Sequence, residues 1–247
     1  MPEGDTIFRT ASRLQQALAG KRVTRFETVL PQLARVDDQS PLRGRTIEQV
    51  VARGKHLIID FSGDLHLRTH MRMSGEWHLY RHGERWWRPR RDMRIVIETD
   101  DFVAVGFAIP VAEFSVDALR HLGPDFLADD FDVAEAMRRA RSMESDEIGN
   151  VLLNQRVAAG VGNIWKSETL FRCGVDPFRH VGEIDDATLE RIVKAARALL
   201  RKSATSGAEK QVYGRRGEPC RKCGTAIRYA KQGTDARGTY WCPRCQG

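Results

Sequence analysis

The chain has 247 residues, of which 41% are hydrophobic and 30% are charged, with a formal net charge of +7. This length allows a sizeable core, and we expect it to divide into domains. No apolar run approaches the ~20 residues of a membrane span, and acids stand where a signal peptide would carry Lys or Arg. We therefore expect a cytoplasmic protein, in a bacterial-type cytosol or nucleoid, with no membrane partner.

The charge is unevenly placed. Residues 1–94 hold 18 Lys and Arg against 11 Asp and Glu, and residues 201–247 hold 11 against 3. Residues 95–150 hold 4 against 13. Two basic ends around an acidic middle favour a polyanionic partner, with nucleic acid as the natural candidate. Solvated surface charge is the alternative.

The first residues offer a nucleophile. If Met1 is removed, Pro2 becomes a terminal secondary amine, and α-amino groups titrate near pH ~8, so part of it is neutral and nucleophilic in the cell. Glu3 beside it could exchange protons with the group that is attacked. On these residues alone, the start of a helix is the simpler interpretation. The apolar spacing predicts that helix over residues 5–19, with Gly20 ending it.

Residues 23–114 read as short β-rich runs between turns, the pattern of a β-sandwich or barrel. Lys55 follows Gly54 at the start of one run, where an ammonium and backbone could approach a phosphate together. The loop of residues 70–75 carries long flexible side chains, Met73 among them. Ordinary hairpin turns with solvated basic residues are the alternative.

Residues 85–91 mix aromatic and guanidinium planes, in the order Arg-Trp-Trp-Arg-Pro-Arg-Arg. Such mixtures stack on bases or lie along phosphates. They occur equally on ordinary hairpin surfaces.

A linker near residues 123–130 marks a boundary, after which the period is helical over 133–142, 145–154, 164–173 and 185–202. Gly160 and Gly162 precede the third of these helices, with Asn163 at its expected cap. Backbone N–H groups in this turn could bind an anion, and we expect a DNA phosphate.

Four cysteines form two pairs, Cys220 with Cys223 and Cys242 with Cys245, with 18 residues between the pairs. This spacing predicts a four-thiolate zinc site. A hairpin over residues 231–240 should lie between the pairs and present Arg237 near its exposed end. Cys173 is unpaired and is expected to be a small core residue.

Three motifs together resemble those of the Fpg/Nei DNA glycosylases. They are Pro2-Glu3-Gly4 at the start, the segment from Gly160 to Glu168, and the cysteine module with Arg237-Gly238-Thr239. The segment Val212–Arg215 fits as well, so the resemblance covers nearly the whole chain. The opening Met-Pro-Glu-Gly looks more like the endonuclease VIII (Nei) branch.

The resemblance implies an α+β fold with three parts and DNA between them. Residues 1–123 would be an N-terminal helix and catalytic β-sandwich, residues 124–210 a helix–two-turn–helix domain, and residues 211–247 a zinc finger with one structural Zn²⁺. It also implies a monomer acting on damaged double-stranded DNA, with single-stranded or bubble DNA as further partners.

The resemblance also implies residue roles. Pro2 would attack C1′ of a damaged nucleotide and Glu3 would help to open the sugar. Lys55, Asn163 and Arg237 would bind flanking phosphates, with Lys55 also serving catalysis. Met73 would fill space left by the flipped base, and Glu168 would support the DNA site from behind.

The implied chemistry is a base-excision reaction on a nucleotide turned out of the stack. An iminium on Pro2 acidifies the C2′ hydrogen, so β,δ-elimination can follow base loss. Departures from the family pattern bear on substrate choice: residues 104–110 contain no Arg, and Asn154 replaces an Asp before Gln155. We expect oxidised pyrimidines to be preferred. The alternatives are 8-oxoguanine or formamidopyrimidine specificity, and a non-catalytic DNA-binding zinc-finger protein.

Overall fold

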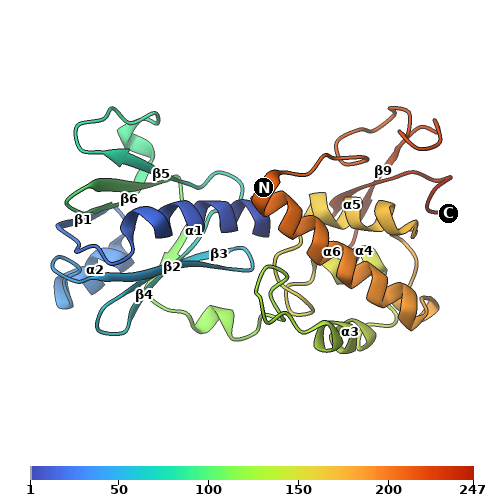
Figure 1. The fold of residues 1–247 in the computed structure, drawn as a ribbon, viewed down its shortest axis with the longest axis horizontal. Coiled ribbons are helices and arrows are strands. Elements are labelled where there is room, and N and C mark those ends of the chain that lie inside the picture. Colours follow the sequence, from blue (N-terminus) through green and yellow to red (C-terminus); the bar gives the residue numbers. More distant parts are fainter. Residues whose placement is uncertain (1) are drawn as a thin grey trace. The chain divides into compact units, whose positions relative to one another are not determined.

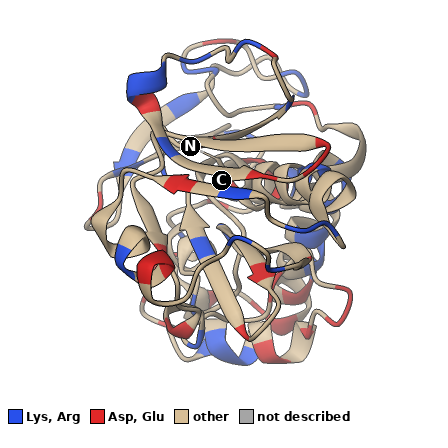
Figure 2. Ribbon diagram, turned by 90° about the vertical axis from the view of Figure 1, so that its left-hand side faces the viewer, with Lys and Arg blue, Asp and Glu red and all other residues tan. Residues whose placement is uncertain are grey.

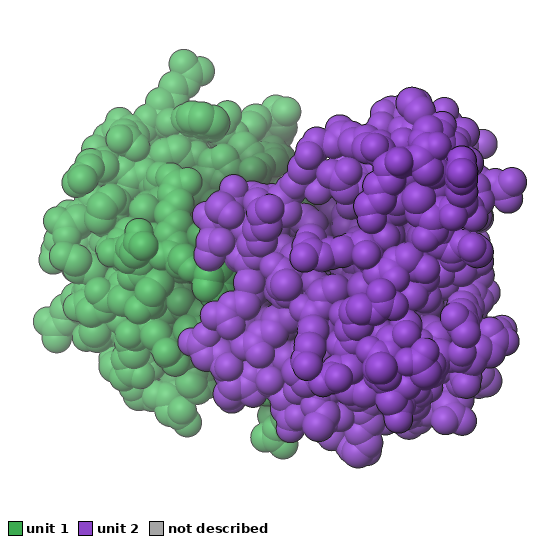
Figure 3. Space-filling view, turned by 45° about the vertical axis from the view of Figure 1, so that its right-hand side comes forward, with its two compact units in different colours: residues 1–2, 6–120 green, residues 3–5, 121–247 purple. Residues whose placement is uncertain are grey.

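The computed structural model describes residues 2–247, so Met1, whose removal would make Pro2 the N-terminus, lies outside the described residues. The chain forms two compact units, coloured separately in Figure 3: residues 1–2 with 6–120, and residues 3–5 with 121–247. Each unit has its own hydrophobic core. The predicted ranges 1–123, 124–210 and 211–247 stay predictions. Among residues 2–247, no helix combines the length and apolar character needed to cross a membrane.

The first unit contains two four-stranded antiparallel sheets, in the orders β1-β6-β7-β5 and β2-β3-β4-β8 (Figure 1). The strands of the first sheet are β1 (Arg25–Thr28), β5 (Glu76–Arg81), β6 (Met93–Glu98) and β7 (Phe102–Phe107). Those of the second are β2 (Ile47–Arg53), β3 (His56–Phe61), β4 (Leu65–His70) and β8 (Val111–Glu113). Inward-facing residues of both sheets share one core, which confirms the predicted β-sandwich.

Helix α1 (Gly4–Leu18) packs on this core through Ile7, Ala11, Leu14 and Leu18, each at most 2% exposed. These positions recur at the helical period that the sequence shows, so the predicted helix is confirmed to within a residue at each end. Gly20 follows with a φ of 75°, a left-handed conformation that glycine adopts without strain.

One α-helix and one strand of the first unit were not predicted. Helix α2 (Pro31–Gln39) begins at a proline and buries only Leu33, so it has no run of buried apolar residues at the helical period. Strand β8 has three residues and pairs with β4, too short a run for alternation to show.

The second unit is built around helix α5 (Asn163–Cys173), which packs against helix α6 and strand β10. Almost every residue of α5 is buried, including the polar run from Lys166 to Thr169. The other helices are α3 (Val133–Arg141), α4 (Ile148–Leu153) and α6 (Asp186–Ser206). The hairpin predicted between the cysteine pairs is formed by β9 (Arg228–Gln232) and β10 (Arg237–Trp241).

Candidate active site

The Glu3 carboxylate is held by the N-terminus of α5. Its Oε2 accepts from the N–H groups of Gly162 at 3.0 Å and Trp165 at 3.2 Å, and its Oε1 from Ile164 at 2.7 Å. Glu3 is 2% exposed. The N–H groups that open a helix have no partners within it and carry a partial positive charge, so they stabilise a carboxylate. The second residue of the chain's opening motif is therefore fixed by a segment about 160 positions away in the sequence.

The two glycines of the turn make room for this contact. A Cβ on Gly162 would lie 2.4 Å from the Glu3 Cδ, and Gly160 has a φ of 116°. Gly4 N–H donates to the Gly160 carbonyl at 2.9 Å, and a Cβ on Gly4 would meet the Gly160 Cα at 2.9 Å. The prediction that this turn's backbone holds a DNA phosphate is therefore corrected: the anion bound there is the carboxylate of Glu3.

Asn163 is the first residue of α5, and the N-cap is Gly162 rather than Asn163 as predicted. Its side-chain Oδ1 is buried and has no hydrogen-bond partner among residues 2–247. The amide Nδ2 is the donor that a phosphate oxygen would need. The predicted phosphate contact of Asn163 stays a prediction.

Asn154 and Gln155 brace the turn that leads to α5. Asn154 Oδ1 accepts from the Arg156 N–H at 3.0 Å, and Gln155 Oε1 accepts from the Gly160 N–H at 2.9 Å. An Asp at position 154 would offer the same acceptor, so the departure noted in the sequence leaves this turn unchanged.

Lys166, which the sequence did not single out, joins α5 to the hairpin. Its Nζ donates to Thr239 Oγ1 at 2.6 Å, and Gln232 Nε2 donates to Glu147 Oε2 at 2.9 Å. Burial lowers the pKa of Lys166 to about 8, although the nearby carboxylates of Glu3 and Glu147 act to raise it. Because a lysine inside a helix usually faces solvent, only the packing of α5 could show this role.

Arg237 opens β10, opposite Gln232 in the hairpin register, and is near the exposed end as predicted. Its side chain is 45% exposed and lies 3.4 Å from Asp235. Through Lys166, the strand that carries Arg237 is fixed to the helix that holds Glu3.

Glu168 is buried, and its carboxylate accepts from the backbone N–H groups of Gln211, Val212 and Tyr213 at 2.8 to 3.0 Å. It thereby fixes the segment that leads into the cysteine module. Whether this segment supports DNA binding, as predicted for Glu168, stays a prediction.

In the first unit, Lys55 lies in the turn between β2 and β3, after Gly54 with a φ of 59°. The ring centroids of His56 and His70 are 4.7 Å apart. Burial and the charges of Arg72, Lys55 and Arg68 lower the pKa of His70 to about 4, so this imidazole is neutral at pH 7. The cations that depress this pKa form a positive field that favours an anion.

Met73 is 72% exposed on the loop between β4 and β5. Met71 on the same loop is 2% exposed and anchors it in the core. Gly75 permits the tight return, because a Cβ there would lie 2.7 Å from the Met71 carbonyl oxygen. The loop thus presents one flexible apolar side chain to a partner, which is the geometry that the predicted role of Met73 requires.

Residues 104–110 form the end of β7 and a three-residue connection to β8. Most of this segment is buried, although Ala108 is half-buried and Pro110 is exposed. The segment therefore has no Arg and forms no protruding loop that could fill the gap left in a DNA stack by a flipped base.

The four cysteine sulfurs lie within 4.8 Å of one another. Two of the separations are 3.9 Å, between Cys220 and Cys245, and 3.4 Å, between Cys223 and Cys242. Four thiolates at about 2.3 Å from a tetrahedral zinc ion are separated by about 3.8 Å, so these residues fit the ion. Cys173 is buried in the helical core and is not a member of this set.

Three family models match successive parts of the chain. They are the formamidopyrimidine-DNA glycosylase N-terminal domain over residues 1–109, the formamidopyrimidine-DNA glycosylase H2TH domain over 122–212, and the zinc finger found in FPG and IleRS over 217–247. "Probable endonuclease 8 2" of Streptomyces coelicolor is 40% identical, with 100% of this chain and 94% of that protein covered. The chain belongs to the Fpg/Nei family.

A second Fpg/Nei relative is the Mycolicibacterium smegmatis "DNA-(apurinic or apyrimidinic site) lyase Nei2", which is 38% identical with 100% and 99% covered. These names support the Nei-like branch. The crystal structure of Lactococcus lactis Fpg with DNA containing an abasic site aligns with a TM-score of 0.86 at 24% identity, covering 100% of both chains. The predicted fold class, the family and the single structural Zn²⁺ are confirmed.

Removing one zinc ligand should unfold the terminal module of this family member. We expect Cys242→Ser to lose the ion, weaken DNA binding and expose residues 217–247 to proteolysis, because metal binding supplies folding free energy to such small domains. Metal analysis and limited proteolysis measure both effects. Cys173→Ser is the matched control and should keep one zinc per chain. Folded, active wild-type protein without zinc would contradict this expectation.

Proposed function

We propose that this protein is a bifunctional DNA glycosylase and AP lyase of base excision repair. The observation that carries the proposal is the Glu3 carboxylate, held by three N–H groups at the N-terminus of α5 and directly preceded by Pro2. Family membership supports the same reaction class. The protein acts as a monomer on damaged duplex DNA, with single-stranded or bubble DNA as further substrates.

The reaction begins when the neutral Pro2 nitrogen attacks C1′ of the flipped nucleotide and the damaged base leaves. Glu3 accepts the proton that the nitrogen then loses and passes it to the ring oxygen, which opens the sugar and leaves an iminium. The iminium acidifies the C2′ hydrogen, so proton loss expels the 3′ phosphate and a second elimination expels the 5′ phosphate. Hydrolysis releases Pro2. The zinc ion stabilises the fold and takes no part in these steps.

Oxidised pyrimidines are the preferred substrates in this proposal. The Nei-type opening motif and the absence of an Arg in residues 104–110 both favour them. Specificity for 8-oxoguanine or formamidopyrimidine is the second candidate. It is favoured by the exposed Met73, which matches the Fpg-type residue that fills the space left by the flipped base.

Borohydride trapping on duplexes that contain an abasic site, dihydrouracil, thymine glycol or 8-oxoguanine tests chemistry and specificity together. Covalent trapping with dihydrouracil and thymine glycol, above that with 8-oxoguanine, is the expected result. Preferential trapping with 8-oxoguanine would replace the pyrimidine proposal. A folded protein that binds these duplexes but traps none of them would be a DNA-binding protein without the chemistry.

Lys55, Asn163 and Arg237 bind phosphates in this proposal, and salt titrations distinguish their charges. Each cationic phosphate contact adds about 0.9 to the slope of log K against log salt on duplex DNA. Arg237→Ala and Lys55→Ala should each weaken binding to a non-cleavable abasic duplex and lower the slope by about 0.9. Asn163→Ala should weaken binding at nearly unchanged slope, because its side chain is uncharged.

Arg244→Ala is the matched control for Arg237, because it removes an exposed cation from the same module. Equal slope changes for Arg244→Ala and Arg237→Ala would mean that the module contributes only diffuse charge. Unchanged affinity and slope for Arg237→Ala would remove Arg237 from the phosphate contacts.

A further inference from the structure

The loop between β5 and β6 takes no part in the proposed chemistry. It leaves β5 at Arg81, opposite Phe102, and rejoins the sheet at Met93, opposite Phe107. It therefore returns along the whole length of β5. On this face of the sheet, Tyr80, Val96, Val105 and their neighbours form an apolar cluster separate from the sandwich core, and Trp86 packs against it.

Contacts of three successive residues, Trp86, Trp87 and Arg88, hold the loop in place. The Trp86 ring is 5.6 Å from the Phe107 ring, edge to face. The Trp87 N–H donates to the Tyr80 hydroxyl at 3.2 Å, and the Arg88 guanidinium is paired with Glu76 and Asp92. The loop is therefore an ordered platform, and a ligand would meet little entropic cost in ordering it.

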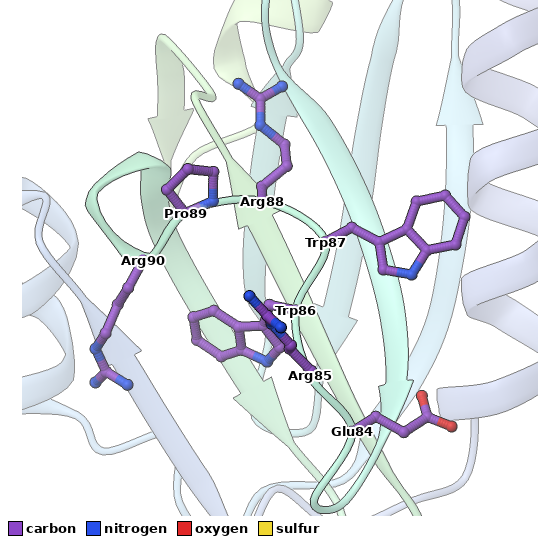
Figure 4. A pocket seen from close by; sticks show the side chains of 7 residues that line it. All are labelled: Glu84, Arg85, Trp86, Trp87, Arg88, Pro89 and Arg90. Atoms are coloured by element: carbon purple, nitrogen blue, oxygen red, sulfur yellow. The ribbon is translucent and has the colours of Figure 1, made fainter.

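Trp87 is left outside this platform with 88% of its surface exposed. In Figure 4 its ring extends to the opposite side of the loop from Trp86. Trp77 and Trp165, by comparison, are 6% and 2% exposed. An indole held in water on a braced backbone is a stacking surface ready for a flat partner.

The loop that carries Trp87 is rich in arginine. Residues Glu84–Arg90 line a hollow of about 570 Å³, and residues 84–91 contain four Arg and one Glu. Arg88 and Arg90 have carboxylate partners, whereas no ion pair engages Arg85 or Arg91 within residues 2–247. Acidic as well as basic residues occur on this side of the molecule (Figure 2). Positive charge alone therefore does not set the loop apart; the presence of an exposed indole and of arginines without ion pairs on the same loop does.

The loop also meets the loop that carries Met73. Ala108 links them, because its N–H donates to the Asp92 carbonyl at 2.7 Å and its own carbonyl accepts from Ser74 Oγ at 3.3 Å. Met73 and Trp87 are the most exposed large apolar side chains among residues 2–247, and their loops flank the same strand. Glu76 begins β5 directly after the Met73 loop, and Tyr80, whose hydroxyl accepts from the Trp87 backbone N–H, lies four residues further along this strand. These two points of β5 are therefore about 13 Å apart.

We propose that Trp87, with Arg85 and Arg91, forms a second nucleic-acid contact that binds an unpaired base and its flanking phosphates in single-stranded DNA. Stacking on an indole needs a base whose face is free, which duplex DNA does not offer. Arg85 and Arg91 lie two positions before and four positions after Trp87 on the same loop, so their guanidiniums can bind phosphates on either side of such a base. This inference rests on the proposed function, since it extends DNA binding to single-stranded and bubble substrates.

Anisotropy titrations with an oligothymidylate and with an undamaged duplex test this contact in the full-length protein. Trp87→Ala should weaken oligothymidylate binding about 5- to 150-fold and change duplex binding less than about twofold. Arg85→Ala/Arg91→Ala should lower the single-strand salt slope by about 1.4. Arg35→Ala/Arg43→Ala, which removes two exposed cations from another region of this unit, should leave that slope unchanged.

Wild-type affinity of Trp87→Ala for oligothymidylate, or an equal loss on duplex and single strand, would overturn the proposal. Binding of a poly-glutamate peptide that is lost in Trp87→Ala, with single-strand binding intact, would make the loop a protein-docking surface instead. Borohydride trapping on an abasic duplex tests the proposed glycosylase and lyase chemistry separately from the single-strand contact. Trapping by Trp87→Ala should match wild type, and failure of every variant to trap would refute the proposed chemistry without touching this contact.

Discussion

Replacing Pro2 by glycine should lower borohydride trapping on an abasic duplex by more than about 100-fold, because a small misplacement of a nucleophile costs that much. Glycine keeps an α-amino group, but it loses the pyrrolidine ring that fixes the direction of the nitrogen. Gel separation of the covalent complex after a short reaction measures the effect. Intact-mass analysis should accompany it, because a retained Met1 converts the Pro2 nitrogen into an amide and abolishes the chemistry.

Pro41→Gly, at an exposed turn of the same unit, is the matched control and should trap as wild type does. Two lysines are competing amines. Lys55 lies in the predicted phosphate site, and Lys166 has its pKa lowered to about 8 by burial. If Pro2→Gly traps as efficiently as wild type while Lys55→Ala or Lys166→Met does not, that lysine is the nucleophile.

Glu3→Gln should lower base excision by about 100-fold or more, because positioned acid–base groups contribute rate factors of that order. Both oxygens of the carboxylate accept from α5 N–H groups, so an amide nitrogen in place of either would face a donor. Some loss of stability should accompany the loss of catalysis. Lyase action on a preformed abasic site should fall less, because that sugar already opens spontaneously.

Comparing excision and lyase rates, with the melting temperature and the affinity for a non-cleavable abasic duplex, separates the two effects of Glu3→Gln. Asp5 makes a suitable control, since it lies two residues after Glu3, in the first turn of α1, and accepts from Ser203 Oγ at 2.6 Å. Asp5→Asn should lower the melting temperature without a selective loss of excision. Equal loss of excision and lyase activity in Glu3→Gln would assign Glu3 to folding or binding instead.

Local signals in the sequence determined much of this protein. The spacing of Cys220, Cys223, Cys242 and Cys245 was sufficient for the zinc site, because a tetrahedral ion takes four ligands and two Cys-x2-Cys pairs supply four thiolates. The period of Ile7, Ala11, Leu14 and Leu18 was sufficient for the first helix, and alternation was sufficient for most strands. Pro2 and Glu3 are neighbours in the sequence, so the prediction of a nucleophile beside an acid–base group did not require the structure.

Tertiary structure decided what these residues contact. Glu3 lies about 160 positions from the α5 N–H groups that hold it, and no local pattern records such a contact. The sequence showed Gly162 only as a flexible residue, whereas the structure shows that a Cβ there would collide with Glu3. The sequence alone suggests that Lys166 is a surface lysine, whereas the structure buries it within α5. Likewise, the sequence places Trp87 in an ordinary hairpin, and only the structure shows that its loop is anchored along β5. Each of these roles depends on long-range packing, which brings together residues that the local sequence keeps apart.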